Sequence, residues 1–184
     1  MPTSFFLMIC IALSQLLAFP ITAKPNSISF IQCPWELDGR VWSAYNFSNH
    51  EKHGVVRYFP AGQGIKDWSE LVTMQWFEES AVAPLSYYSA FVEGLRKTFP
   101  AQQINHQILH GGEMSLLAEW ESSAEQKATS YGVIRVFSCF PHIYLLTYLC
   151  RDPSKFEQAK KTWRAICGQA NLNFNAIDRL TLPK

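Results

Sequence analysis

Two tight chain reversals, Gly111-Gly112-Glu113 and Pro141-His142, constrain the fold more than any other feature of the sequence. They separate four segments rich in apolar residues, which are 104–110, 114–121, 131–140 and 143–150. Glycine and proline at such short connections are typical of β-hairpins. Because so short a connection joins only antiparallel neighbours, the sequence predicts two hairpins of an antiparallel sheet in this half of the chain.

The first half of the chain predicts three further strands. Segments 42–47 and 54–59 are rich in aromatic and β-branched residues and are joined by a polar turn. In the stretch KDWSELVTMQWFEES, residues 66–80, the apolar residues follow a period of two better than a helical period. Leu71, Thr73, Gln75 and Phe77 then share one side of a strand, and the other, strongly apolar side carries Val72, Met74 and Trp76.

Two segments have the periodicity of amphipathic helices. Residues 84–99 repeat large apolar side chains at helical spacing, with Pro84 suited to the first turn and Pro100 marking the end. A second helix is predicted from Pro153 to Cys167, with a polar capping sequence before it and Gly168 after it. The predicted fold class is therefore α+β, an antiparallel sheet of about six or seven strands flanked by two main helices.

The first 23 residues contain no charged side chain and are almost continuously apolar from Phe5 to Phe19. This pattern predicts a secretory signal peptide cleaved near Ala23, although no Lys or Arg precedes the apolar run. The alternative, a membrane anchor, needs about 20 uninterrupted apolar residues. No later segment is long and apolar enough to span a bilayer. We therefore expect residues 24–184 to form a single globular domain that is exported, either periplasmic or secreted.

The charge balance excludes one class of partner. The chain has 16 Lys and Arg against 15 Asp and Glu, a net charge of +1, with no basic run. Nucleic-acid binding depends on clustered positive charge that displaces counterions. We therefore expect no nucleic-acid partner.

Four cysteines remain after the predicted signal peptide, and an even number in an oxidising compartment favours disulfide bonds. If Pro141 and His142 form the reversal, Cys139 lies about 20 Å along the hairpin from Cys150. The second helix runs back over about 21 Å, which brings Cys167 near the level of Cys139. This geometry favours the pairs Cys139–Cys167 and Cys33–Cys150 over the other two pairings.

The order of strands and helices over residues 42–167 resembles that of the PsbP-like superfamily of α/β/α sandwiches, which includes small exported bacterial proteins of the DcrB type. The segment Asp67-Trp68-Ser69-Glu70-Leu71-Val72-Thr73 is similar to the aromatic-then-acidic start of a central strand in these domains. The resemblance implies a compact module that binds or assembles with other proteins and lacks a catalytic centre.

No catalytic, metal or cofactor motif stands out. A nucleophile elbow, a phosphate-binding loop and a zinc motif are all missing from the sequence. Glu119 and Glu121 share a strand face about 7 Å apart, and ion pairs or solvent account for them without a catalytic role. His106 and His110 are too far apart along a strand to bind one ion. We expect no enzyme activity and no cofactor.

The sequence has 13 Phe, seven Tyr and six Trp, which is a heavy aromatic load. If only one face of the sheet is buried, some aromatic side chains stay exposed and form a contact surface for a partner. The candidates are Trp42, Trp68, Trp76, Tyr87 and Tyr88. Ordinary core packing of the same residues is the alternative.

Two functions follow from these observations. The first is an exported, non-enzymatic binding or assembly protein of the bacterial envelope or secreted fraction, acting through contact with another envelope or secreted protein. The second is a carrier of a small apolar ligand, with a pocket between helix 84–99 and the sheet. A co-purifying ligand distinguishes the second from the first.

Overall fold

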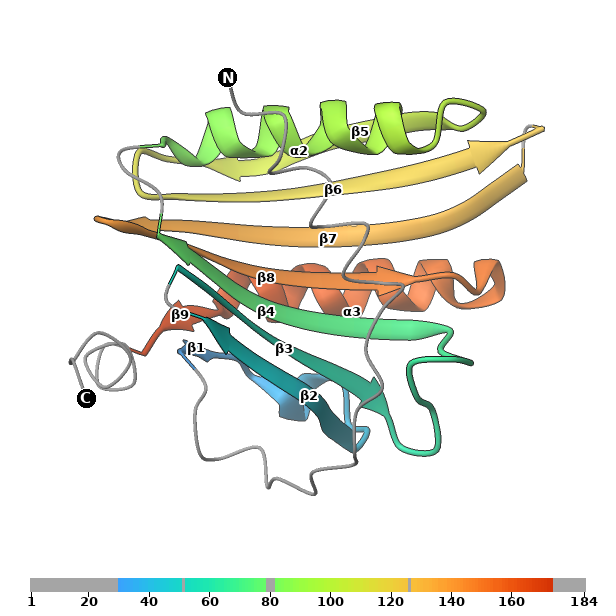
Figure 1. Cartoon of the computed structure of the whole chain (residues 1–184). Helices are drawn as coiled ribbons and strands as arrows, with labels where there is room; N and C mark the ends of the chain where they lie inside the picture. Colours follow the sequence, from blue (N-terminus) through green and yellow to red (C-terminus); the bar gives the residue numbers. More distant parts are fainter. Residues whose placement is uncertain (1–29, 51, 79–81, 126, 174–184) are drawn as a thin grey trace.

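The computed structural model describes residues 30–50, 52–78, 82–125 and 127–173. Seven antiparallel strands form the main sheet in the order β2-β3-β4-β8-β7-β6-β5 (Figure 1). Their bounds are β2 Trp42–His50, β3 His53–Pro60, β4 Glu70–Glu78, β5 Gln103–Gly111, β6 Ser115–Ala124, β7 Lys127–Cys139 and β8 His142–Cys150. The predicted α+β class and strand number are confirmed.

The sheet joins two strand meanders that are separate in the sequence. The strands β2, β3 and β4 follow one another, as do β5 to β8, and the two groups meet where β4 pairs with β8. This pairing runs from Glu70 opposite Cys150 to Glu78 opposite His142. Because β4 and β8 are central, each has a strand on both sides and a layer of side chains on both faces.

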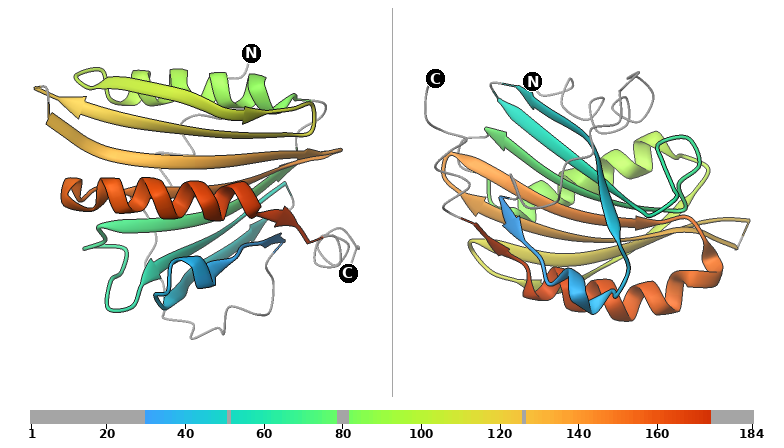
Figure 2. Two further views of the ribbon diagram at one scale, coloured as in Figure 1. Left: turned by 180° about the vertical axis from the view of Figure 1, so that it is seen from behind. Right: turned by 90° about the horizontal axis from the view of Figure 1, so that it is seen from below.

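The two helices lie on opposite faces of the sheet (Figure 2). Helix α2, Pro84–Thr98, packs on β5, β6 and β7, and helix α3, Phe156–Gln169, packs on β7 and β8. Pro84 occupies the first turn of α2, as predicted. A short 3-10 turn, η2 Pro153–Lys155, precedes α3, and the Asp152 carboxylate accepts from the Ser154 backbone N–H at 3.1 Å.

The chain ends of the described region meet beside α3. Strand β1, Ile31–Gln32, pairs with β9, Asn171–Leu172, in a separate two-stranded sheet. The 3-10 turn η1, Trp35–Leu37, then crosses α3. The predicted signal peptide, residues 1–23, lies outside the described residues, as does the tail 174–184.

The core has a separate apolar cluster on each face. On the α3 face, Val72, Met74 and Trp76 of β4 pack with Trp163 and the strands beside them. Tyr88 and Phe91 of α2 anchor the cluster on the other face. The predicted alternation along residues 71–77 is confirmed, because Val72, Met74 and Trp76 are all buried on the α3 face.

The β7–β8 reversal differs from its predicted position. Cys139 pairs with His142, so the turn is made by Phe140 and Pro141. The predicted reversal at Pro141 and His142 would place Cys139 opposite Tyr144, which instead pairs with Phe137. The register therefore shifts by two residues, which leaves each side chain on the same face of the sheet but changes its neighbours.

Cys33, Cys139, Cys150 and Cys167 are free thiols in this structure, so neither predicted disulfide is present in it. The Cys150 thiol donates to the Asp152 carbonyl before α3 begins, at 3.5 Å. Cys33 instead follows Gln32, which pairs with Asn171 beyond the end of α3. Cys33 and Cys150 therefore lie beside opposite ends of α3, and their pairing stays a prediction.

We propose Cys33 and Cys167 as a further pair, because the Cys33 thiol is near enough to affect the pKa of Cys167. Both belong to the packing of the α3 face, and burial raises the pKa of Cys33 to about 12. Burial also raises the pKa of Cys167, and the nearby Cys33 thiol raises it further. On oxidation we expect a Cys33–Cys167 bond, with Cys139 and Cys150 left as thiols. Non-reducing peptide mapping tests this, and a Cys139–Cys167 or Cys33–Cys150 peptide contradicts it.

Candidate functional site

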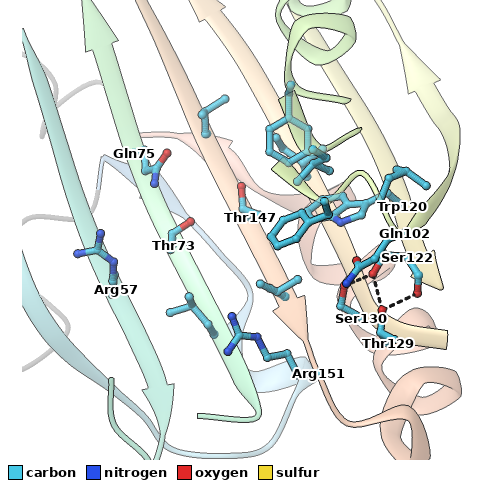
Figure 3. A pocket seen from close by; sticks show the side chains of 18 of the residues that line it. Arg57, Thr73, Gln75, Gln102, Trp120, Ser122, Thr129, Ser130, Thr147 and Arg151 are labelled. Atoms are coloured by element: carbon cyan, nitrogen blue, oxygen red, sulfur yellow. Dashed lines mark hydrogen bonds between the residues drawn. The ribbon is translucent and has the colours of Figure 1, made fainter. Parts of the chain in front are cut away.

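A cavity of about 440 Å³ lies between α2 and the sheet (Figure 3). It lies where α2 packs mainly on β5, β6 and β7, and residues of β3, β4 and β8 on the same face line the space beside the helix. The cavity is within the 300–1,000 Å³ range of small-molecule sites.

The wall of the cavity on the helix side is apolar. Tyr87, Phe91 and Leu95 of α2 line it, and Phe99 follows at the end of the helix. These residues recur every four positions, so they form one stripe on the helix. Trp120 of β6 continues the apolar wall, with its ring 5.1 Å from that of Phe91.

The floor of the cavity carries polar side chains in the middle of the sheet. Thr73 and Gln75 of β4 and Thr147 of β8 line it. Thr73 pairs directly with Thr147, and Arg57 of β3 pairs with Thr73, so the three form a row across neighbouring strands. Thr73 and Gln75 lie on the side of the strand that was predicted to be the less apolar one.

Two arginines line the cavity, and they are the only charged groups among the described residues that do so. The Arg57 residue is 6% exposed, and burial lowers the pKa of its guanidinium. The Arg151 guanidinium lies 3.7 Å from the centre of the Trp68 ring, and burial lowers its pKa too. The polar floor thus has two arginines, and the lining residues that the structure describes include no carboxylate.

A cluster of three hydroxyl groups closes another part of the cavity. The Ser122 hydroxyl lies 2.6 Å from that of Ser130 and 2.9 Å from that of Thr129. The polar composition of residues 122–130 suggests an exposed linker, but β6 and β7 extend through most of this segment and Ser122 is buried. Thr129 and Tyr131, two positions apart, are residues that favour strands, and this spacing was the sequence signal that could have predicted β7 here.

Gly132 of β7 makes room for Trp120. The two residues pair across β6 and β7, and a Cβ atom added at Gly132 would overlap the Trp120 ring. Glycine in a strand often marks such a close approach. The position of one wall of the cavity therefore depends on the missing side chain of Gly132.

The variant Gly132→Ala is expected to lower the free energy of unfolding by about 1–3 kcal/mol, because the Trp120 ring has to move within a packed core. Urea denaturation measures this loss. Gly111→Ala is the matched control, since its new Cβ atom meets only Ile108 Cγ2 at 3.7 Å. Equal midpoints for Gly132→Ala and the wild type would show that the ring moves without cost.

The five aromatic residues predicted as a contact surface all lie in the interior. Trp42 and Trp76 pack on the α3 face, Tyr87 and Tyr88 on the α2 face, and Trp68 in a third cluster with Phe59 and Leu71. The expectation that some of these five stay exposed is wrong, because each face of the sheet carries a buried cluster that takes them in. Tyr87 is the one of the five that lines the cavity.

The two acids of β6 are bound to bases on α3. Arg164 donates two hydrogen bonds to Glu119, both 2.6 Å long, and the Tyr131 hydroxyl donates a third at 2.9 Å. Lys160 lies 3.2 Å from Glu121. Each carboxylate therefore holds the helix to the sheet, on the face opposite the cavity.

Over residues 30–50, 52–78, 82–125 and 127–173, no group of three or more His, Cys, Asp or Glu side chains is placed to hold a metal ion. Among the helices of this same part of the chain, none is long and apolar enough to cross a membrane.

A seven-stranded antiparallel sheet with one helix on each face defines the class of fold, an α+β sandwich. No protein-family model matches the chain, and no curated protein matches it. Its fold is similar to the solution structure of cyanobacterial PsbP (CyanoP) from Synechocystis sp. PCC 6803. The likeness covers 83% of this chain and 98% of that chain, with a TM-score of 0.49 and 7% identity. This likeness concerns the arrangement of helices and strands alone.

Proposed function

We propose that the protein binds a small, largely apolar ligand in the cavity between α2 and the sheet. The main support for this proposal is the cavity, whose wall is formed by apolar residues such as Phe91 and Leu95 and whose floor has a few polar groups. Such a combination is typical of ligand sites, in which apolar contact supplies affinity and a few polar groups fix orientation. This is the carrier function that the sequence placed between helix 84–99 and the sheet.

The proposal includes export and binding without catalysis. The charge-free, apolar segment 1–23 supports export to the periplasm or the medium, with residues 24–184 as the mature domain. The acids Glu70 and Glu119 are engaged by bases on the face away from the cavity, and the described lining residues include no acid. These features favour a binding protein over a hydrolase.

Mass spectrometry under native conditions tests the proposal, with protein purified from its own source without detergent. We expect a small molecule at one copy per chain. Leu95 lines the cavity, so Leu95→Trp should fill it and abolish the ligand-bound mass. Leu85 lies on the exposed side of the same helix, so Leu85→Trp should retain the ligand-bound mass. Protein that carries no ligand, and that also fails to bind the neutral apolar dye N-phenyl-1-naphthylamine, would contradict the proposal.

Assembly with another envelope or secreted protein is the second candidate, and it would use residues other than the five predicted aromatics. Met114 is 60% exposed and Phe140 is 76% exposed. They lie near each other at one end of the sheet, because the Ser138 backbone N–H donates to the Met114 carbonyl at 2.9 Å. Site-specific crosslinking from position 140 in intact cells tests this, and crosslinks that do not differ from those of an exposed control position, Lys161, would exclude it.

A further inference from the structure

We propose, on the basis of the ligand-binding function above, that the ligand is an amphipathic anion whose negative group is held by Arg57 and Arg151. The cavity places these two guanidinium groups on the polar floor and the apolar stripe of α2 along the wall. Figure 3 shows Arg57 on the far side of the cavity from Trp120, with Thr73 and Thr147 between them. One end of the ligand is thus apolar, and the other is a carboxylate, sulfate or similar group.

The charge of the cavity differs from that of the chain as a whole. The net charge of the protein is only +1, with nearly equal numbers of acids and bases. The described lining residues nevertheless include two cations and no acid. Because a charged group in a poorly hydrated site is stabilised mainly by opposite charge and hydrogen bonds, this local excess favours a ligand with negative charge.

Arg57 is a built part of the site and not a surface residue that happens to be near. Arg57 is only 6% exposed, and it lies in the middle of β3, where it pairs with Thr73. A central strand position holds the side chain in a narrow range of directions, toward the face that α2 leaves uncovered. Burial lowers the pKa of this guanidinium, and a bound anion would act in the opposite direction.

Arg151 is positioned by an aromatic ring. Its guanidinium stacks on Trp68 at 3.7 Å from the ring centre, and Trp68 is itself buried. Stacking uses the flat face of the guanidinium and leaves its N–H donors, which lie in the plane, directed outward. Within the described part of the chain, Arg151 takes part in none of the ion pairs. A planar acid group such as a carboxylate matches this geometry.

Two hydroxyl groups lie between the arginines and the apolar wall. Thr73 pairs with Arg57 on one side and with Thr147 on the other, and directly opposite residues have Cβ atoms about 4.5–5.5 Å apart. A hydroxyl is both a donor and an acceptor, so it also binds an anion. The polar end of the ligand therefore has charged and neutral donors in one row, and its apolar end reaches Phe91 and Leu95.

The experiment compares three probes with the same alkyl chain and different head groups, decanoate, decanol and decylammonium, by displacement of N-phenyl-1-naphthylamine. We expect decanoate to bind at least about tenfold more tightly than decanol, and decylammonium to bind most weakly. Arg57→Gln and Arg151→Gln should each weaken decanoate binding by about tenfold and leave decanol unchanged. Arg96→Gln, an exposed position on α2 that does not line the cavity, is the control and should change neither.

The outcomes separate this inference from the function on which it rests. Equal affinity for the three probes would contradict the inference that the ligand is an anion, but it would still agree with the ligand-binding function. If none of the probes and no dye binds, the ligand-binding function fails as well. If Arg57→Gln does not fold, Arg151→Gln still tests the inference, because Arg151 is exposed. The conservative variant Arg57→Lys is a second test. It keeps the positive charge and should retain most of the preference for decanoate over decanol.

Discussion

Replacing Trp163 by alanine is expected to lower the free energy of unfolding by about 3–5 kcal/mol, because it removes the largest fully buried side chain of the described core. The Trp163 ring is stacked on Tyr148 at 4.3 Å with an interplanar angle of 8°. It also meets the edges of Trp35 and Trp42, at 6.0 and 5.2 Å. Its removal leaves a cavity that none of these rings can fill without leaving its own contacts.

Trp163→Phe is the matched control for this prediction. The Trp163 Nε1 atom has no hydrogen-bond partner within the described part of the chain, so phenylalanine gives up volume but no hydrogen bond. We expect it to cost less than half as much as alanine. Guanidinium denaturation measures both variants, and limited proteolysis should show earlier cleavage near Trp35 in Trp163→Ala. A loss below about 1 kcal/mol for alanine would mean that α3 repacks freely.

Glu70→Gln is expected to lower the free energy of unfolding by about 2–3 kcal/mol. The Glu70 carboxylate is 2% exposed and accepts hydrogen bonds from Arg40 at 2.8 and 2.7 Å, Tyr148 at 2.8 Å and Lys155 at 3.2 Å. It therefore connects β4 to β8, to the start of α3 and to the chain before β2. The effect is limited because the two bases are partly exposed and regain water when the carboxylate is lost.

The same variant has a predictable pH dependence. Burial alone would raise the pKa of Glu70, but the hydrogen bonds from Arg40, Tyr148 and Lys155 together lower it below its ordinary value of 4.5. The carboxylate therefore contributes its full stability above pH 4.5, and this contribution disappears as the pH falls through the lower pKa of the folded protein. The midpoint difference between wild type and Glu70→Gln should shrink below pH 4.5.

Glu93→Gln is the control for Glu70→Gln. Glu93 forms an ion pair with Arg96 at 2.6 Å on the outer surface of α2, where both side chains are exposed. Exposed pairs contribute little, so we expect a change within about 0.5 kcal/mol at every pH. If Glu70→Gln behaved in the same way, the Glu70 network would be a surface contact and not a connection between elements.

The helices and strands followed from local patterns because local patterns are what create them. The helix predicted over residues 84–99 is observed as Pro84–Thr98, since its apolar stripe and its bounding prolines act within a few residues. The same is true of the alternating segment 71–77. The sequence also predicted which strands pair as hairpins. The exact register was not predicted, because the turn at Phe140 and Pro141 shifts it by two residues.

The sequence predicted where the cavity lies but not which polar residues line it. The sequence placed a pocket beside helix 84–99, whereas Arg57, Arg151 and the Ser122 hydroxyl cluster were not recognised as part of it. Arg57 and Arg151 are 94 positions apart and come together only through the pairing of β3, β4 and β8. No local pattern marks an arginine in a strand as a lining residue, because that depends on whether a helix covers it.

The sequence by itself determined the type and order of the elements and which side chains share a strand face, because backbone periodicity requires only neighbouring residues. The tertiary structure decided how β4 and β8 meet and how far α2 extends across the sheet. Those two choices buried the aromatic residues on both faces and left Arg57 beside an open space. Long-range packing makes such choices, since the free energy depends on how whole faces fit together and not on any single segment.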